Sequence, residues 1–514
     1  MDRRDFITTV GALSVATAAG ELTRAAERSV DPTEQSIGAL QSAMASGATS
    51  AEALTASYVD RIARYDHAGP QHRSVLSLNP NALADARALD QQRKAGKLRG
   101  TLHGIPILVK DNIETLDPLP TTAGSYALAG SLRPDSPLVA RLRAGGAVIL
   151  GKANLSEWAN FRSTRSCSGW SGIGGQARNA YSRDRNPSGS SAGSGVAAAA
   201  SFCAGAIGTE TNGSILSPSS LNGLVGFKPT VGLVSGKGVV PVSPRQDTTG
   251  PMCRTVADAA LIANIMVERP IGFGRHGTSL EEFRLAGVRI GVMPLPEGVH
   301  PGTKQLFADA HAVLEHEGAV LVDLKNPAAF SEMDAFQLEA LLYEFKSAIN
   351  AYLAGLDASQ VEPRSLSALI AFNQAHKDRE LVIFGQEIFE MAQERGTLSD
   401  DSYVKGRAGL DRAADAEGLA KLLDTAEVLL APSNGPAELI DPVWGDRHGG
   451  GWAQIASAAA IAGYPSITVP AGLVNGLPVG ITLVGKRHQD GMLLQVARAY
   501  ERAANSRIAP YIAG

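Results

Sequence analysis

The stretch that decides the fold reads PSGSSAGSGVAAAASFCAGAIGTETNGSILSPSSLN and runs from residue 187 to residue 222. It consists almost entirely of Gly, Ser, Ala and Thr, a composition that a flexible linker would share. A linker has no use for Val196, Phe202 and Ile207, however, and Glu210 is the one charged residue of the stretch. Because small residues let backbones pack closely, we interpret the stretch as a packed helix with its loops.

On either side of this stretch, short β-branched runs flanked by Gly or Pro alternate with helical patterns. The predicted strands are 105–109, 147–150, 288–292, 428–430, 466–469 and 479–484. Helical spacing predicts helices near both ends, at 37–44 and 493–500, and Thr49 with Glu52 forms a capping-box pattern for another. The alternation predicts one large α/β domain, with a central mixed β-sheet and helices on both faces.

Residues 300–425 are more helical and more charged than the rest, with examples at 340–356 and 368–394. We predict that they form a cover over one face of the site, inserted between core regions at 102–260 and 425–514. Substrate selection is expected there, because variable covers shape pockets on a fixed scaffold.

The composition excludes several classes of partner and site. A net charge of −4 over 514 residues gives no strong attraction to nucleic acid or to an anionic membrane. The three cysteines cannot form a disulfide framework, and their spacing matches no metal motif. We therefore expect small buried or half-buried thiols, no metal site and no cofactor.

The first residues, MDRRDFITTVGALSVATAAG, resemble a twin-arginine export signal. The apolar run that follows Arg3 and Arg4 is far shorter than the roughly 20 residues of a membrane-spanning helix. We expect residues 1–28 to be a signal peptide, residues 29–514 to be the mature domain, and the protein to be periplasmic or secreted. The alternative is an ordinary N-terminus that happens to contain two arginines.

Lys110 ends the apolar run Gly-Ile-Pro-Ile-Leu-Val-Lys at 104–110. Burial at the end of a strand lowers the pKa of a lysine, and the neutral amine can then accept a proton. Ser190 lies in Ser-Gly-Ser-Ser at 188–191, where a helix start offers free N–H groups. A phosphate loop is excluded there, because no lysine follows the glycines.

Ser214 follows Asn212 and Gly213, a pair that favours a tight turn with an exposed hydroxyl. The backbone N–H groups of residues 211–214 can converge on one oxygen, which is the geometry of an oxyanion hole. Taken alone, Lys110, Ser190 and Ser214 each have an ordinary structural explanation.

Taken together, the three motifs resemble the amidase signature family, whose members use a Ser-Ser-Lys triad. The spacing of 24 residues between Ser190 and Ser214 matches the family pattern. Further matching motifs are GFKPT at 226–230, QDTTGPM at 246–252, GYPSITVP at 463–470 and GLPVG at 476–480. Segments at 154–161, 342–346, 369–376 and 384–387 resemble the bacterial peptide amidases, which release ammonia from C-terminally amidated peptides.

The resemblance implies the amidase signature fold and a role for each residue of the site. Ser214 would be the nucleophile, Ser190 the proton relay and Lys110 the final proton acceptor. The backbone N–H groups of Thr211, Asn212 and Gly213 would form the oxyanion hole. The bond between Gly189 and Ser190 would be cis, and Ser191 would be structural.

Three positions depart from the family pattern: Ser188 and Asn212 replace glycines, and Leu216 stands where arginine is frequent. Loss of that arginine disfavours substrates that carry a carboxylate. We expect a monomer or homodimer that hydrolyses small-molecule or short-peptide amides. The alternatives are a general aliphatic, aryl or cyclic-amide amidase, the glutamine-hydrolysing subunit of a tRNA-dependent amidotransferase, and a non-enzymatic solute-binding protein.

Overall fold

The computed structural model describes residues 30–272, 279–447 and 452–512, so the expected signal peptide at 1–28 lies outside the described residues. The described chain forms an 11-stranded mixed sheet and a small sheet of β4 (Trp170–Ser171) and β5 (Gly175–Gln176). In spatial order the main sheet contains β1 (Val75–Leu78), β3 (Val148–Ala153), β2 (Pro106–Lys110), β6 (Gly205–Glu210), β8 (Thr248–Cys253), β7 (Val225–Lys228), β12 (Ser466–Val474), β13 (Leu477–Gly485), β11 (Val428–Pro432), β9 (Arg289–Val292) and β10 (Val320–Asp323).

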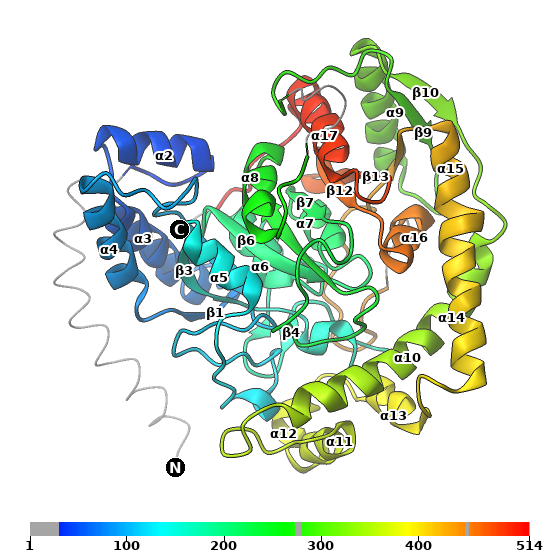
Figure 1. The fold of residues 1–514 in the computed structure, drawn as a ribbon, viewed down its shortest axis with the longest axis horizontal. Helices are drawn as coiled ribbons and strands as arrows, with labels where there is room; N and C mark the ends of the chain where they lie inside the picture. Colours follow the sequence, from blue (N-terminus) through cyan, green and yellow to red (C-terminus); the bar gives the residue numbers. More distant parts are fainter. Residues whose placement is uncertain (1–29, 273–278, 448–451, 513–514) are drawn as a thin grey trace.

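Helices surround this sheet, which confirms the predicted fold class (Figure 1). Those around the sheet are α2 (Ile37–Ser46), α3 (Ala51–Arg61), α4 (Ala82–Lys94), α5 (Pro137–Ala144), α6 (Ala192–Ala199), α7 (Leu216–Leu221), α8 (Val256–Met266), α9 (Pro301–His316), α15 (Ala420–Thr425), α16 (Gln454–Ala462) and α17 (Asp490–Ala504). Shorter 3₁₀ and π turns are η2 (Ile62–His67), η3 (Tyr126–Leu128), η4 (Glu157–Asn160) and η6 (Asp415–Leu419).

Helices pack on both faces of the sheet. A methyl group on Gly205 of β6 would meet Ile262 of α8, whereas one on Gly208 would meet Ser191 at the start of α6. Residues three apart in a strand point to opposite faces, so α8 and α6 lie on opposite sides of β6. The stretch 187–222 therefore forms the centre of the domain, as its small residues predict.

All six predicted strands are present, as β2, β3, β9, β11, β12 and β13. Five other strands of the main sheet, and both strands of the small sheet, were not predicted, and two of them, β6 and β8, are central in the main sheet. Their sequences, GAIGTE and TTGPMC, contain glycine and few β-branched residues, so they resemble loops. The neighbouring strands on either side complete their hydrogen-bond ladders.

The start of α3 differs from the predicted capping box. Ser50, not Thr49, is the N-cap residue, and its hydroxyl accepts a hydrogen bond from Ala53 N at 3.1 Å. The carboxylate of Asp90 accepts from the two preceding backbone N–H groups, at 2.8 and 3.0 Å. The N–H groups at the start of α3 therefore have acceptors without Glu52. The Glu52 side chain forms an ion pair with Arg87 of α4 and takes no part in a capping box.

The helical cover begins later than predicted. Both α9 and β10 fall within 300–425, yet β10 pairs in parallel with β9 and extends the main sheet. The cover helices are α10 (Phe330–Ala354), α11 (Leu366–Ala375), α12 (Lys377–Glu380), α13 (Glu387–Glu394) and α14 (Asp401–Ala414), at the lower right of Figure 1. The expected helix at 368–394 is interrupted between α12 and α13, because Arg162 donates to the carbonyl of Phe384 and accepts from the N–H of Ile388.

The sheet brings the predicted site residues together. β2 and β6 are parallel neighbours, with Val109 opposite Ile207. Their carboxyl ends therefore lie at the same edge, which places Lys110 beside Thr209. The loop at 188–191, called the serine loop below, also lies at this edge, because Ser190 contacts Lys110 there. The turn that carries Ser214 follows β6 at the same edge.

Candidate active site

Lys110 is the last residue of β2, and its side chain is completely buried. Its Nζ donates hydrogen bonds to Ser190 Oγ at 2.7 Å and to Thr209 Oγ1 at 2.8 Å. Burial lowers the pKa of Lys110 from 10.5 to about 7, and the nearby carboxylates of Asp247 and Glu210 oppose this shift. Much of the amine is therefore neutral near neutral pH, as a proton acceptor must be.

Thr209 holds Lys110 in place and was not identified from the sequence. Its Oγ1 also accepts a hydrogen bond from Asn112 Nδ2 at 3.0 Å. Ser191 Oγ bonds both backbone groups of Thr209: it donates to the carbonyl at 3.0 Å and accepts from the N–H at 3.1 Å. Ser191 thus fixes β6, the structural role expected of it. Thr209 would have been identified only if β6 had been predicted as a strand beside β2.

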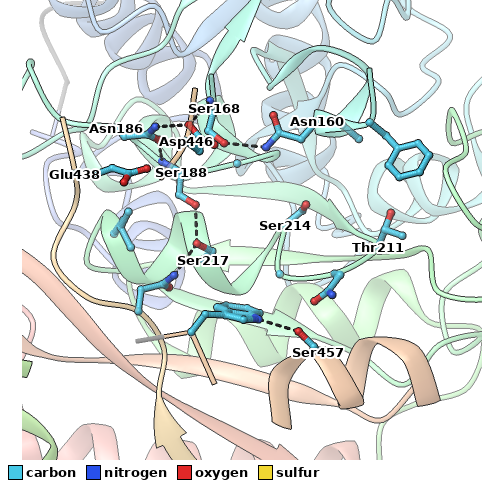
Figure 2. Close-up of a pocket in the computed structure, with 18 of the residues that line it drawn as sticks. Asn160, Ser168, Asn186, Ser188, Thr211, Ser214, Ser217, Glu438, Asp446 and Ser457 are labelled. Atoms are coloured by element: carbon cyan, nitrogen blue, oxygen red, sulfur yellow. Dashed lines mark hydrogen bonds between the residues drawn. The ribbon is translucent and has the colours of Figure 1, made fainter. Parts of the chain in front are cut away.

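The serine loop is fastened to the cavity wall. The peptide bond between Gly189 and Ser190 is cis, as the family resemblance implies. Ser188 has a φ of 61°, the left-handed region that favours glycine. Its Oγ forms a hydrogen bond of 2.6 Å with Ser217 Oγ, which also accepts from Asn434 Nδ2 at 3.0 Å (Figure 2). These bonds join the loop to α7 and to the segment after β11.

Ser214 lies on the turn between β6 and α7, on the wall of a cavity of about 470 Å³ (Figure 2). Thr211, Asn212 and Gly213 line the same cavity. Within the described residues, no protein acceptor binds the backbone N–H groups of residues 211–214. Four N–H donors without acceptors beside a half-buried serine hydroxyl make this turn the candidate oxyanion hole.

The hydroxyls of Ser214 and Ser190 are not hydrogen-bonded to each other in the described structure. The structure therefore contains the hydrogen bond between Lys110 and Ser190 but not one between the two serines. Hydrogen bonds of this kind are often long without substrate and shorten when it binds.

The Glu210 carboxylate holds the end of the turn that leads into α7. Its Oε2 accepts hydrogen bonds from the N–H groups of Ile215, at 2.7 Å, and Leu216, at 3.1 Å. The carboxylate thereby satisfies two of the free N–H groups at the start of α7. Leu216, at the position where the family pattern frequently has arginine, is an uncharged and buried side chain. No cation from this position therefore reaches the cavity.

Gly213 is fitted closely against Trp452. Its φ is 81°, and a Cβ at this position would lie 2.9 Å from the Cη2 atom of the Trp452 ring. Ser457 Oγ accepts a hydrogen bond from Trp452 Nε1 at 2.9 Å, which fixes the ring (Figure 2). The turn therefore has room only for glycine at this position.

A buried polar network joins the turn to the cover. Thr211 Oγ1 donates to Asp247 Oδ1 at 2.6 Å, and Gln246 Nε2 donates to the Thr211 carbonyl at 3.2 Å. Arg407 of α14 donates to Gln246 Oε1 at 3.1 Å and to Glu344 Oε1 of α10 at 3.3 Å. Two cover helices thus support the residues that carry the free N–H groups.

An aromatic cluster forms a second link to the cover. Phe161 packs edge-on against Phe345 at 5.1 Å between ring centroids, and Trp158 packs against Phe389 at 5.7 Å. Phe345 and Phe389 stack on each other at 5.2 Å. Because Phe161 and Leu341 line the cavity, the cover determines the shape of that wall.

The three cysteines are free and buried, as predicted. No cluster of three or more His, Cys, Asp or Glu residues suited to a metal ion occurs in the part of the chain that the structure describes. No helix within 30–272, 279–447 or 452–512 is both long and apolar enough to cross a membrane.

Comparison with known proteins adds to this geometry. A family model described as Amidase matches residues 53–494. The native peptide amidase of Stenotrophomonas maltophilia is 42% identical, with a TM-score of 0.87 over 94% of this chain and 99% of that chain. A peptide amidase solved with the competitive inhibitor chymostatin is 43% identical, with the same TM-score over 93% of this chain and 99% of that one. A protein of Arabidopsis thaliana named as a probable amidase is 38% identical over 480 residues, 88% of this chain and 86% of its own length.

Proposed function

This chain belongs to the amidase family and is a hydrolase of amide C–N bonds, and from that premise we propose that it releases ammonia from C-terminally amidated peptides. The proposed triad is Ser214 as nucleophile, Ser190 as proton relay and Lys110 as final proton acceptor. The hydrogen bond from Lys110 Nζ to Ser190 Oγ, directly behind the cavity that contains Ser214, carries the proposal.

The first chemical step is acylation. Ser214 Oγ bonds to the amide carbonyl carbon and gives its proton to Ser190, while Ser190 passes its own proton to the neutral amine of Lys110. The carbonyl oxygen becomes negatively charged. The N–H groups of Thr211, Asn212 and Gly213 would stabilise that charge, because these residues line the cavity and their N–H groups have no acceptor among the described residues.

The second step releases ammonia. As the C–N bond breaks, the ammonium of Lys110 returns its proton through Ser190 to the leaving nitrogen. The substrate's acyl group then remains on Ser214 as an ester. Water attacks this ester with the same relay, which yields a carboxylic acid and restores the serine hydroxyl. The residues account for every proton, and no cofactor enters the scheme.

Two observations support a peptide amide as substrate. The similarity to peptide amidases extends over at least 93% of this chain and therefore includes the cover. Phe345, in the cover segment at 342–346, packs against Phe161 of the cavity wall. Phe384, in the cover segment at 384–387, accepts a hydrogen bond from Arg162, the residue after Phe161. We expect a monomer or homodimer acting on short peptides.

Ammonia release from four substrates tests the proposal: an N-acetylated dipeptide amide, a free amino-acid amide, an anilide and glutamine. We expect the highest kcat/KM for the dipeptide amide and no activity in Ser214→Ala. Preference for the anilide would indicate a general amidase, and preference for glutamine would indicate an amidotransferase-like specificity. Absence of turnover with all four would contradict the proposal.

We further propose that residues 1–28 export the folded protein by the twin-arginine route. Arg3 and Arg4, followed by a short apolar run, support this assignment. Replacing both arginines by lysine in the full chain should retain the protein in the cytoplasm of an expressing bacterium. Unchanged export of that variant would contradict the proposal.

A further inference from the structure

The described wall of the cavity contains ionisable side chains of only one sign. Glu438 and Asp446 line it, and none of the described lining residues is Lys, Arg or His. The remaining polar groups of the wall are hydroxyls, amides and backbone groups. A cavity with this charge pattern attracts cations and repels anions.

The Asp446 carboxylate is held in the cavity wall by hydrogen bonds. Its Oδ1 accepts hydrogen bonds from Ser168 N at 2.9 Å and from Asn186 Nδ2 at 2.7 Å (Figure 2). Both donors are neutral, so they fix the carboxylate without cancelling its charge. Asp446 therefore contributes negative potential, while its position is set by the fold.

Glu438 is free to bind a ligand. Its Oε1 accepts from the backbone N–H of Arg447 at 3.0 Å, and among the described residues no donor binds Oε2. The guanidinium of Arg447 does not neutralise it, because that group pairs with Asp441 at 3.1 Å. The Glu438 carbonyl accepts from Asn186 N at 2.8 Å, which fixes its backbone against the serine loop. Figure 2 shows the carboxylate at one end of the cavity, turned toward Ser188.

From this arrangement we propose that Glu438 determines specificity by binding a protonated amine or guanidinium on the acyl half of the amide substrate. The inference rests on the proposed amidase site at Ser214. Two sources supply such a cation: the free α-ammonium of an amino-acid amide or short peptide, and the side chain of a lysine or arginine. The half-buried position of Glu438 weakens the screening that an ion pair at an open surface experiences.

Matched pairs of substrates separate the two sources. For the side-chain source, the N-acetylated amide of lysine is compared with that of norleucine, which has the same stem without the charge. For the α-ammonium source, leucine amide is compared with its N-acetylated form. We expect kcat/KM to favour the cationic member of at least one pair by about tenfold, mainly through KM, and the preference to shrink at high salt.

The variant Glu438→Gln keeps the Oε1 acceptor for Arg447 N and removes the charge. It should abolish the preference in the responsive pair and leave kcat/KM for the neutral member unchanged. The control Glu394→Gln makes the same charge change on α13, at a side chain that is 76% exposed and outside the cavity, and should retain the preference. Glu438→Lys should instead favour the N-acetylated amide of glutamic acid over that of glutamine.

Three results would overturn the inference. One is a wild-type enzyme that hydrolyses the neutral amides but shows no charge preference in either pair, which would leave the proposed function intact. Another is an equal loss for neutral and cationic substrates in Glu438→Gln, which would indicate a structural role. The third is no turnover of any amide, which would overturn the proposed function as well.

Discussion

Lys110 Nζ lies 2.7 Å from Ser190 Oγ, with both side chains completely buried at the edge where β2 and the serine loop meet. The pair lies behind the cavity wall rather than on it, because neither residue lines the cavity that contains Ser214. In the proposed mechanism, the substrate therefore contacts the turn at 211–214, and Lys110 acts through Ser190. This separation keeps water away from the amine, and burial is the cause of its lowered pKa.

The pH dependence of catalysis should follow Lys110. Its pKa is lowered from 10.5 to about 7, and only the neutral amine, which predominates above that pKa, can accept a proton. We expect kcat/KM for an amidated dipeptide to rise as the pH increases through about 7 and then to level off. Lys110→Met should lower the rate by roughly 10²–10⁴-fold, the usual contribution of a general base. A profile that falls across this range, or a fully active Lys110→Met, would refute the lysine mechanism.

Removal of the nucleophile should abolish acyl-enzyme formation and leave the fold intact. Ser214 is half-buried on the cavity wall, so Ser214→Ala removes one hydroxyl without creating a core cavity. Ammonia release should fall to background while the thermal midpoint stays within about 2 °C, because the substitution leaves no core cavity and breaks no hydrogen bond of the Ser214 hydroxyl within the described residues. Residual turnover near the wild-type level would assign the nucleophile to another residue.

Thr209 should act as a positioning residue for the lysine. Its hydroxyl accepts from Lys110 Nζ, and an acceptor stabilises the ammonium more than the neutral amine. Thr209→Val should therefore move the rising limb of the pH–rate profile to lower pH and lower kcat on the order of tenfold. The control Thr209→Ser keeps the hydroxyl and should preserve the profile. If the valine variant loses activity with an unshifted limb, Thr209 supports only the fold.

The turn at 211–214, which carries the proposed oxyanion hole, should not tolerate a side chain at Gly213. Gly213→Ala places a methyl group 2.9 Å from the fixed ring of Trp452, at a φ of 81°. We expect kcat to drop by about 10²–10³-fold, the cost of losing an oxyanion donor. Gly476 has a φ of 80° but no atom within 4 Å of its missing Cβ, so Gly476→Ala carries the same backbone strain without the clash. Equal losses of activity in the two variants would mean that the Trp452 contact is unimportant.

The buried polar network that joins the turn at 211–214 to the cover helices should contribute to the free energy of unfolding. Arg407 and Glu344 are buried, with side-chain exposures of 5% and 2%. Arg407→Met would remove the nearer cationic partner of Glu344, at 3.3 Å, and leave only the more distant and exposed Arg245, at 4.0 Å. Removing one member of such a pair costs about 3–5 kcal/mol of unfolding free energy. Arg412 pairs with Glu332 on the same helix layer at 53% and 51% exposure, so Arg412→Met should cost at most about 1 kcal/mol. Chemical denaturation measures both, and similar losses in the two variants would contradict the importance assigned to burial.

Local sequence patterns were sufficient for much of this protein. The β-branched runs predicted six strands, because a strand buried on both faces requires apolar residues along its length. The small residues at 187–222 predicted a packed centre, since only they allow α6 and β6 to approach closely. The motifs around Lys110, Ser190 and Ser214 predicted the candidate site through their resemblance to the amidase signature pattern, in which the spacing of 24 residues recurs.

Other features depend on partners that are distant in the sequence, and the tertiary structure alone decided them. β6 and β8 are strands because their neighbours complete their ladders, not because of their composition. Asp90 takes N–H groups at the start of α3, and Arg162 interrupts the helical pattern before α13. Thr209 reaches Lys110 across 99 residues of chain, and Glu438 faces the cavity of a serine more than two hundred residues away. A local pattern specifies which residues suit buried chemistry, but burial, charge partners and the lowered pKa of Lys110 arise only when the sheet brings these residues together.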